Sequence, residues 1–350
     1  MSTTTSSEAG APAPSPWGKV AAAVALLTVI ISVLLTAFAW PSVRTTVHDV
    51  PIAVAGPAAA ADRITAALDQ RMPDAFVVTR VADTAAAEAL IRDREVYGAI
   101  DAGAGTPQVI TASAASASVA QALQGVATGL AQSQGQGAAP AVTVRDIVAL
   151  PADDPRGAGL AAAALPLVMG GMLTAVLVTS MLRGASRRVT AALAFAVTGG
   201  LAMAAILQFW FGSLAGSYWA NSGAIALTIA ATSLTLLGLE ALAGFAGFGI
   251  GAAIMMLIGN PLSGAATAPQ MLPGWSGMLG QLLPPGAGGQ LLRSTAYFDG
   301  AGVTHAVTVL LGWLAFGAVL CVIGALRGRR GSAVAAGAEP VVRPVAIDAH

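Results

Sequence analysis

Charged residues are scarce in this chain. Only 10% of its 350 residues are Asp, Glu, Lys or Arg, while 56% are hydrophobic. Ordinary soluble domains carry about a quarter charged residues. This small number of charges cannot cover a globular surface in water. A lipid bilayer is therefore the expected solvent for much of the chain.

Other scarce residue types exclude whole classes of function. The single cysteine, Cys321, excludes an intrachain disulfide and a cysteine-based metal cluster. The net charge is zero, without a basic tract, so nucleic acid is not an expected partner. Lys19 is the one lysine, and no P-loop, H-E-x-x-H or G-x-S-x-G motif occurs. We therefore expect no enzyme activity, no cofactor and no metal.

Long apolar runs are what the sequence has in abundance. They predict an α-helical integral membrane protein with six transmembrane helices, because each run approaches the length needed to cross about 30 Å of hydrocarbon. For the first run, a cleavable signal peptide is the alternative; its length and the non-basic leader favour a retained anchor. The predicted spans are 18–40, 159–182, 189–212, 222–239, 241–258 and 302–326, between a disordered tail at 1–17 and a second tail at 327–350.

Residues 41–158 differ in kind from the rest. Charged residues are scattered here, and apolar residues alternate between the period of a strand and that of a helix. This pattern predicts a mixed α/β domain between the first and second spans. The expected strands are 48–56, 75–83, 97–101, 107–113 and 141–150, and the expected helices are 58–72, 84–96 and 116–132.

Arginines orient the predicted spans. Arg183, Arg187 and Arg188 fill the link between the second and third spans, and three more arginines follow the sixth. Basic residues near span ends favour the cytoplasm. Both tails are therefore expected in the cytoplasm and the α/β domain outside it.

Residues 259–300 form an apolar stretch interrupted by prolines and glycines. Irregular backbone cannot face lipid, because its unpaired N–H and C=O groups are costly there. We expect a re-entrant or interfacial pair of short helices, 270–282 and 286–298, that caps the outer mouth of the bundle, with Trp275, Tyr297 and Phe298 near the membrane interface. The alternative is a surface loop that merely joins two spans.

Two titratable residues are candidate site residues. Glu240 lies between the fourth and fifth predicted spans, so it is either the solvated tip of a cytoplasmic hairpin or a functional carboxylate inside the bundle. The tip is the favoured interpretation. His305, near the outer start of the sixth span, either titrates near neutral pH or is an ordinary interfacial side chain.

The broken segment supplies the other candidates, Asn260, Pro261, Ser263 and Arg293. Arg293 and Asp299 are the only charges within 259–300. If buried, Arg293 pairs with another group such as an anionic ligand; if exposed, both are rim charges, which is the favoured interpretation. Elsewhere, Ala243, Gly247 and Gly251 recur every four residues, which predicts close helix packing.

The order of these parts resembles the ABC-type-2 permease superfamily, and most closely its YhgE/Pip (phage infection protein)-like branch. The resemblance covers residues 20–326. The residues that carry it are Val50-Pro51-Ile52-Ala53-Val54, Leu150-Pro151, Asp154-Pro155-Arg156-Gly157, Gly259-Asn260-Pro261-Leu262-Ser263-Gly264, Leu272-Pro273, Leu283-Pro284-Pro285-Gly286-Ala287, Arg293 and Tyr297-Phe298.

The resemblance implies a permease-like subunit of the bacterial plasma membrane. Such a subunit exports an amphiphilic or envelope-associated compound, works as a homodimer among membrane lipids, and takes its energy from a separately encoded ATPase. The chain departs from that pattern in the link 183–188, RGASRR, which is too short for the coupling helix of such exporters. The alternative is a non-transporting envelope scaffold or receptor with the permease fold and no motor.

Overall fold

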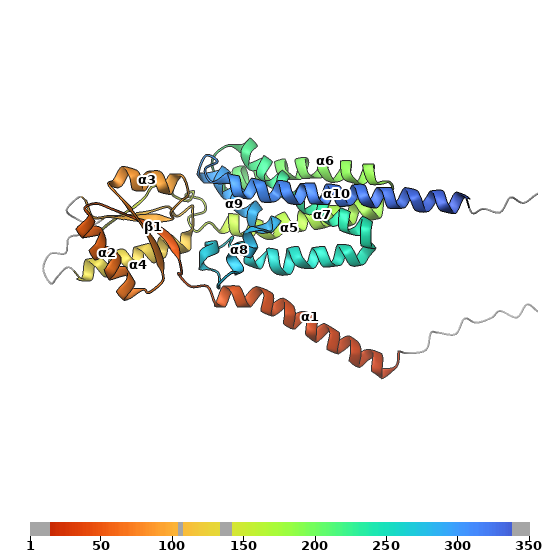
Figure 1. Cartoon of the computed structure of the whole chain (residues 1–350), viewed down its shortest axis with the longest axis horizontal. Helices are drawn as coiled ribbons and strands as arrows, with labels where there is room; N and C mark the ends of the chain where they lie inside the picture. Colours follow the sequence, from red (N-terminus) through yellow and green to blue (C-terminus); the bar gives the residue numbers. More distant parts are fainter. Residues whose placement is uncertain (1–14, 104–107, 134–141, 338–350) are drawn as a thin grey trace, which may run out of the picture.

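The computed structural model describes residues 15–103, 108–133 and 142–337. An α/β domain lies against one end of a helical bundle, here called the domain end; the opposite end is the far end (Figure 1). Most of the expected N-terminal tail lies outside the described residues. The expected C-terminal tail is described up to residue 337, where it continues the last helix.

The α/β domain contains every strand and helix expected from the sequence, with shorter strands. Its mixed sheet has the order β2-β1-β3-β4-β5, and only β3 and β4 are antiparallel. The interior strand β1, between β2 and β3, is an apolar run whose side chains enter cores on both faces. In chain order the elements are β1 (Val50–Ala55), α2 (Ala58–Arg71), β2 (Phe76–Val81), α3 (Thr84–Arg92), β3 (Gly98–Asp101), β4 (Gln108–Thr111), α4 (Ala117–Ser133) and β5 (Thr143–Asp146).

Five helices are long and apolar enough to cross a membrane. The expected spans 222–239 and 241–258 belong to one of them, so the count differs from the six expected. The helices are α1 (Trp17–Val43), α5 (Ala158–Met181), α6 (Ala185–Ala205), α7 (Tyr218–Ala253) and α10 (Val303–Gly337); α6 and α7 continue as π-helical turns to Trp210 and Gly259.

Helix α7 is nevertheless broken at Gly244. This glycine has φ 63° and ψ −150°, which is not helical and which residues with a Cβ rarely adopt. The chain turns back there: a Cβ added to Gly247 would lie 2.3 Å from the Leu239 carbonyl oxygen. The two arms of α7 therefore run side by side, and they turn at Gly244 rather than at Glu240 (Figure 1).

The first arm of α7 forms the centre of the bundle. Its neighbours approach through glycines: a Cβ on Gly171 of α5 would lie 2.7 Å from Thr232, and one on Gly317 of α10 would lie 2.4 Å from the Thr235 nitrogen. Gly251 meets Leu236 in the same way. The expectation of close packing at small residues is confirmed, and the contacts lie within the chain.

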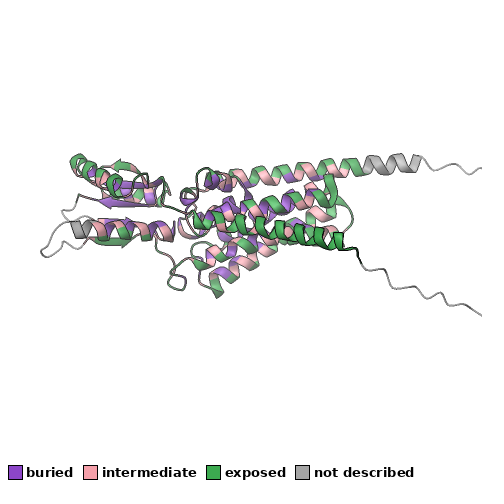
Figure 2. Ribbon diagram, turned by 90° about the horizontal axis from the view of Figure 1, so that it is seen from below, coloured by how far each residue is buried: buried purple, intermediate pink, exposed green. Residues whose placement is uncertain are grey.

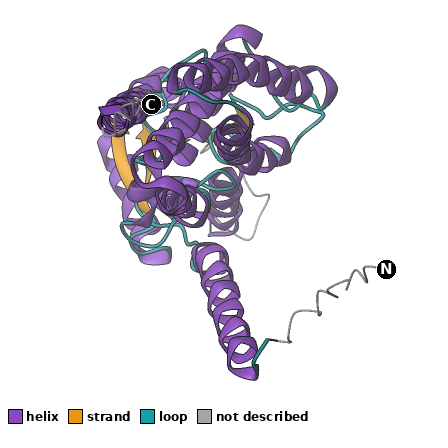
Figure 3. Ribbon diagram, turned by 90° about the vertical axis from the view of Figure 1, so that its right-hand side faces the viewer, coloured by secondary structure: helices purple, strands orange, loops and turns teal. Residues whose placement is uncertain are grey.

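Helix α1 stands apart from the bundle. Pro41, near its C-terminal end, is its only buried residue, and that end contacts residues 254–263. The rest of the helix is exposed along nearly its whole length (Figure 2) and points away from the other helices (Figure 3). An apolar helix without protein neighbours on most of its surface is suited to lipid or to another chain.

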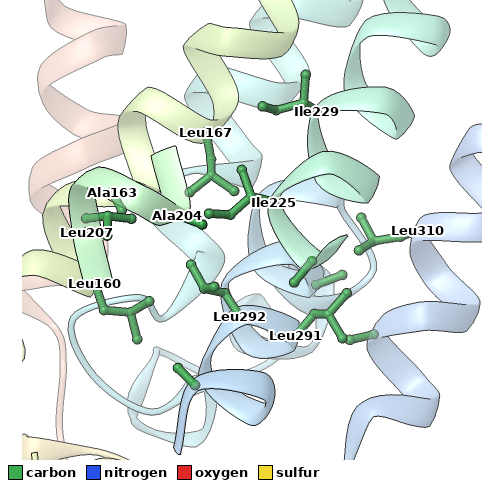
Figure 4. Close-up of a cluster of buried hydrophobic side chains, with 14 of the residues drawn as sticks. Leu160, Ala163, Leu167, Ala204, Leu207, Ile225, Ile229, Leu291, Leu292 and Leu310 are labelled. Carbon is green, nitrogen blue, oxygen red and sulfur yellow. The ribbon is translucent and has the colours of Figure 1, made fainter. Parts of the chain in front are cut away.

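Residues 259–300, here called the cap, lie between the bundle and the α/β domain. The cap contains 3-10 turns at Pro261–Ser263 and Pro269–Met271, then α8 (Ser276–Gln281) and α9 (Pro284–Tyr297). Leu291 and Leu292 of α9 enter the core formed by α5, α6, α7 and α10 (Figure 4). The expected pair of short helices is found, α8 being shorter than expected, and the burial of α9 argues against a surface loop.

Candidate functional site

The structure brings four of the six candidate residues together at the domain end. Asn260, Pro261 and Ser263 line one cavity, and Arg293 donates a hydrogen bond to its wall. The other two candidates lie apart from it: Glu240 is at the far end, and His305 is exposed on the first turn of α10.

The cavity has a volume of about 410 Å³ and is here called the outer cavity, because it lies at the edge of the bundle beside α1. It lies where the C-terminal end of α1 approaches α5 and the start of the cap. Its walls are mostly apolar, but they include hydroxyl and amide groups. The lining residues are Phe38, Pro41, Ser42, Thr45, Ala161, Ala164, Leu165, Asn260, Pro261, Ser263, Gly264, Ala265, Ala266, Thr267 and Leu272.

Local hydrogen bonds fix the loop that forms one wall of the outer cavity. Pro261 ends α7 and starts a 3-10 turn, because it has no N–H to continue the helix. The Ser263 hydroxyl donates to the Asn260 carbonyl (2.7 Å), and Gly264 has φ 65°, a conformation that glycine adopts without strain. The side chain of Gln281, at the end of α8, donates a hydrogen bond to the Ser263 carbonyl (2.8 Å).

Asn260 carries an unpaired polar atom. Its Oδ1 is buried and has no hydrogen-bond partner among the described residues. Buried amide oxygens are nearly always paired, so an unpaired one at a cavity marks a place where a ligand or water can be bound. The sequence indicated this residue through its position at the end of an apolar run.

Arg293 is buried, not a rim charge, and the favoured interpretation of this residue is wrong. Its exposed fraction is 6%, because α9 lies inside the domain end of the bundle. One guanidinium nitrogen donates to the Ala265 carbonyl (2.8 Å), and Nε has no partner among the described residues. Asp299, by contrast, is exposed.

Two residues of the α/β domain bind the cap, and no local sequence pattern indicates them. Arg94 donates to Gln290 Oε1 (2.6 Å) and to the Ser294 hydroxyl, and its guanidinium lies 5.1 Å from the ring centre of Phe298. Tyr97 donates its hydroxyl hydrogen to Gln270 Oε1 (2.9 Å). These contacts join segments roughly 170 to 200 positions apart in the chain, a pairing that no local pattern encodes.

Burial alters the acid–base behaviour of this contact. Burial, together with the smaller effect of the nearby Arg293 charge, lowers the pKa of Arg94 to about 10. Burial also raises the pKa of Tyr97, against a smaller opposing effect of the two arginines. The contact between the α/β domain and the cap is therefore a desolvated region with two positive charges.

The aromatic residues of the cap divide into two groups. Trp275 is 68% exposed at the domain end, as expected for a side chain at a membrane interface. Phe298 is 6% exposed and packs into the core of the α/β domain, so the expectation that it lies at the membrane interface is wrong. The Tyr297 hydroxyl donates to the Ser213 carbonyl inside the protein.

Asp154, one of the residues that carry the resemblance, has a structural role. Its carboxylate accepts hydrogen bonds from the N–H groups of Ala158 (2.8 Å) and Gly159 (2.7 Å). These groups belong to the first turn of α5 and have no partner within the helix. Asp154 therefore caps the helix that enters the bundle from the α/β domain.

At the far end, Glu240 pairs with Arg188 at 3.3 Å. Arg188 also donates to the carbonyls of Leu182 (2.9 Å) and Thr179 (3.0 Å). Glu240 is therefore neither the solvated tip of a hairpin nor isolated inside the bundle. The pair lines a cavity of about 280 Å³ together with Cys321.

The fold defines a multi-pass membrane protein with a small mixed-sheet domain. Within the described residues, no group of three or more His, Cys, Asp or Glu side chains could hold a metal ion. In comparisons with family models, with curated proteins and with solved structures, nothing matches this chain.

Proposed function

We propose that this chain is a permease-like subunit of the bacterial plasma membrane that exports an amphiphilic or envelope-associated compound. The two arms of α7 each cross the bilayer, which gives six crossings, with both termini in the cytoplasm and the α/β domain outside. Arg183, Arg187 and Arg188 at the far end support this orientation. Exposed Trp40, Trp219 and Trp275 suit the headgroup layer at the domain end.

The observation that carries this proposal is the position of the outer cavity. It lies between α1, which has little other contact with the protein, and α5, at the level where the cap meets the bundle. Such a cavity is accessible from the lipid, offers apolar walls to a hydrocarbon tail and has polar groups for a headgroup. It therefore suits an amphiphile better than a water-soluble solute.

A partner ATPase supplies the energy in this proposal, and two chains form the transporter. The exposed surface of α1 is available to membrane lipids or to the second chain. The test is purification in mild detergent, followed by ATP-dependent uptake of labelled envelope lipids into inside-out vesicles. A co-purified P-loop ATPase and uptake that is lost without this chain are the expected results; neither result appears if the proposal is wrong.

A second candidate is an envelope scaffold or receptor without a motor. It is favoured by the link between α5 and α6, which is only residues 182–184; in the part of the chain that the structure describes, no coupling helix lies there. A deletion strain with unchanged lipid transport but altered envelope assembly or phage adsorption supports this candidate over export.

A further inference from the structure

Two arginines where the α/β domain meets the cap have no counter-charge: Arg293 is buried and Arg94 is half-buried. Arg94 and Arg293 lie close enough for the charge of Arg293 to lower the pKa of Arg94. None of the five ion pairs found among the described residues includes either of them. Their partners are neutral: carbonyl, amide and hydroxyl oxygens, and one aromatic ring.

Of the two, Arg293 is the less well satisfied. A guanidinium has five N–H donors, and Arg293 uses one of them in the hydrogen bond to the Ala265 carbonyl, while its buried Nε has no partner. Burying a charge is costly unless an opposite charge and hydrogen bonds compensate for it. Arg293 is therefore a cationic site that lacks its anion in the protein alone.

The outer cavity adjoins the hydrogen-bond partner of this arginine. Ala265, which accepts the hydrogen bond of Arg293, is itself a lining residue of the cavity. The same wall contains Asn260, whose side-chain oxygen is buried without a partner. Because the N and O atoms of an amide can exchange places by rotation, Asn260 can also present N–H donors to the cavity.

The dimensions and surroundings of the cavity fit a lipid headgroup. A volume of about 410 Å³ holds a headgroup but not two acyl chains. Phe38 and Leu165 line the side formed by α1 and α5, where acyl chains can continue into the bilayer along the exposed surface of α1. Ser42 and Thr45 add hydroxyl groups near the end of α1.

We infer that the outer cavity binds the phosphate-bearing headgroup of an anionic amphiphile, and that Arg293 neutralises the phosphate. A shift of the Ala265 peptide exposes the guanidinium, whose planar fork matches two phosphate oxygens. The inference deepens the proposed function, because it names the class of compound that the chain recognises. It also stands separately, since binding requires neither an ATPase nor transport.

The test uses the full chain in nanodiscs of phosphatidylglycerol or of phosphatidylcholine, with native mass spectrometry to count retained lipids. We expect the wild type to retain phosphatidylglycerol in preference to phosphatidylcholine. Arg293→Gln should lower this retention at least about tenfold, the effect of losing a charge-assisted contact. The matched control Arg156→Gln removes an exposed arginine and should bind as the wild type does.

Further measurements separate the loss of lipid binding from misfolding. Ala164→Phe fills the cavity from α5 without touching the charge, and it should also abolish retention. In lipid-free detergent, Arg293→Gln should unfold at a temperature no lower than the wild type, because it removes an uncompensated buried charge. Added phosphatidylglycerol should raise the unfolding temperature of the wild type but not that of Arg293→Gln.

Equal retention of the two lipids by the wild type overturns the inference, as does equal retention of phosphatidylglycerol by the wild type and Arg293→Gln. Stabilisation by inorganic phosphate without lipid retention overturns the assignment to an amphiphile. Retention without ATP-dependent transport leaves the inference standing and contradicts the export proposal instead.

Discussion

The Arg188 guanidinium lies 3.3 Å from the Glu240 carboxylate at the far end of the bundle. Arg188 lies in the first turn of α6. Glu240 lies in α7, four residues before the turn at Gly244, so the pair joins two helices. Both side chains are about a quarter exposed. The arrangement identifies Glu240 as a residue that holds the end of the bundle together.

We expect Glu240→Gln to lower the free energy of unfolding by about 1 kcal/mol, because the pair is partly screened by solvent. Arg188→Gln should cost more, since this side chain also binds the carbonyls of Leu182 and Thr179. Thermal unfolding in detergent of both variants and of the double variant measures their coupling. Additive losses, or transport abolished in Glu240→Gln with unchanged stability, would contradict the structural role.

Neighbouring glycines of α9 provide a matched test of how tightly the cap is packed. A Cβ on Gly288 would lie 2.4 Å from Thr228 of α7, whereas one on Gly289 meets nothing within 4 Å. Gly288→Ala should therefore destabilise the protein by roughly 1–3 kcal/mol. Gly289→Ala should stabilise it by about 0.5–1 kcal/mol through helix propensity. Equal unfolding temperatures of the two variants would show that α9 is not buried against α7.

Arg94 is expected to hold the α/β domain against the cap. Arg94→Gln removes the charged contacts to Gln290 and Ser294, so amide hydrogen exchange in residues 284–297 should accelerate about tenfold or more. The control is Arg92→Gln, two positions earlier, whose exposed side chain pairs with Glu88 of the same domain. If both variants exchange at the wild-type rate, Arg94 does not stabilise the contact between the α/β domain and the cap.

The phenol of Tyr97 gives a pH-dependent signal from the same contact. Burial raises its pKa above the ordinary value of 10.0, since the phenolate would be desolvated. The difference in phenolate absorbance between the wild type and Tyr97→Phe should therefore have its midpoint above pH 10.0. The neutral phenol is the form that the fold favours, so this contribution to stability is present below that pH and is lost as pH rises through the higher pKa. A difference signal centred at or below the ordinary value would contradict the buried contact.

Local patterns in the sequence predicted most elements of the fold. The alternation of apolar residues located the five strands, and the apolar runs located the long helices within a few residues. The turn of the α7 hairpin was misplaced at Glu240, because a charge is a weaker turn signal than a glycine with positive φ, and Gly244 is one of many glycines.

The candidate site was only partly predictable for a related reason. Asn260 and Ser263 follow the end of an apolar run, a local signal, and they do line the outer cavity. The burial of Arg293 depends on the packing of α9 between distant helices, and the contacts of Arg94 and Tyr97 join the α/β domain to the cap. Such long-range pairings leave no periodicity in the sequence.

Outward export requires the α/β domain and the cap to lie outside the cytoplasm, and residue accessibility tests this most directly. In a Cys321→Ala background, Trp275→Cys places a thiol on the exposed surface of the cap, and Ser186→Cys places one at the far end. A membrane-impermeant maleimide applied to intact cells should label Trp275→Cys, and it should label Ser186→Cys only after the membrane is opened. Labelling of Ser186→Cys in intact cells, with Trp275→Cys protected until the membrane is opened, would reverse the orientation and contradict the proposed outward export.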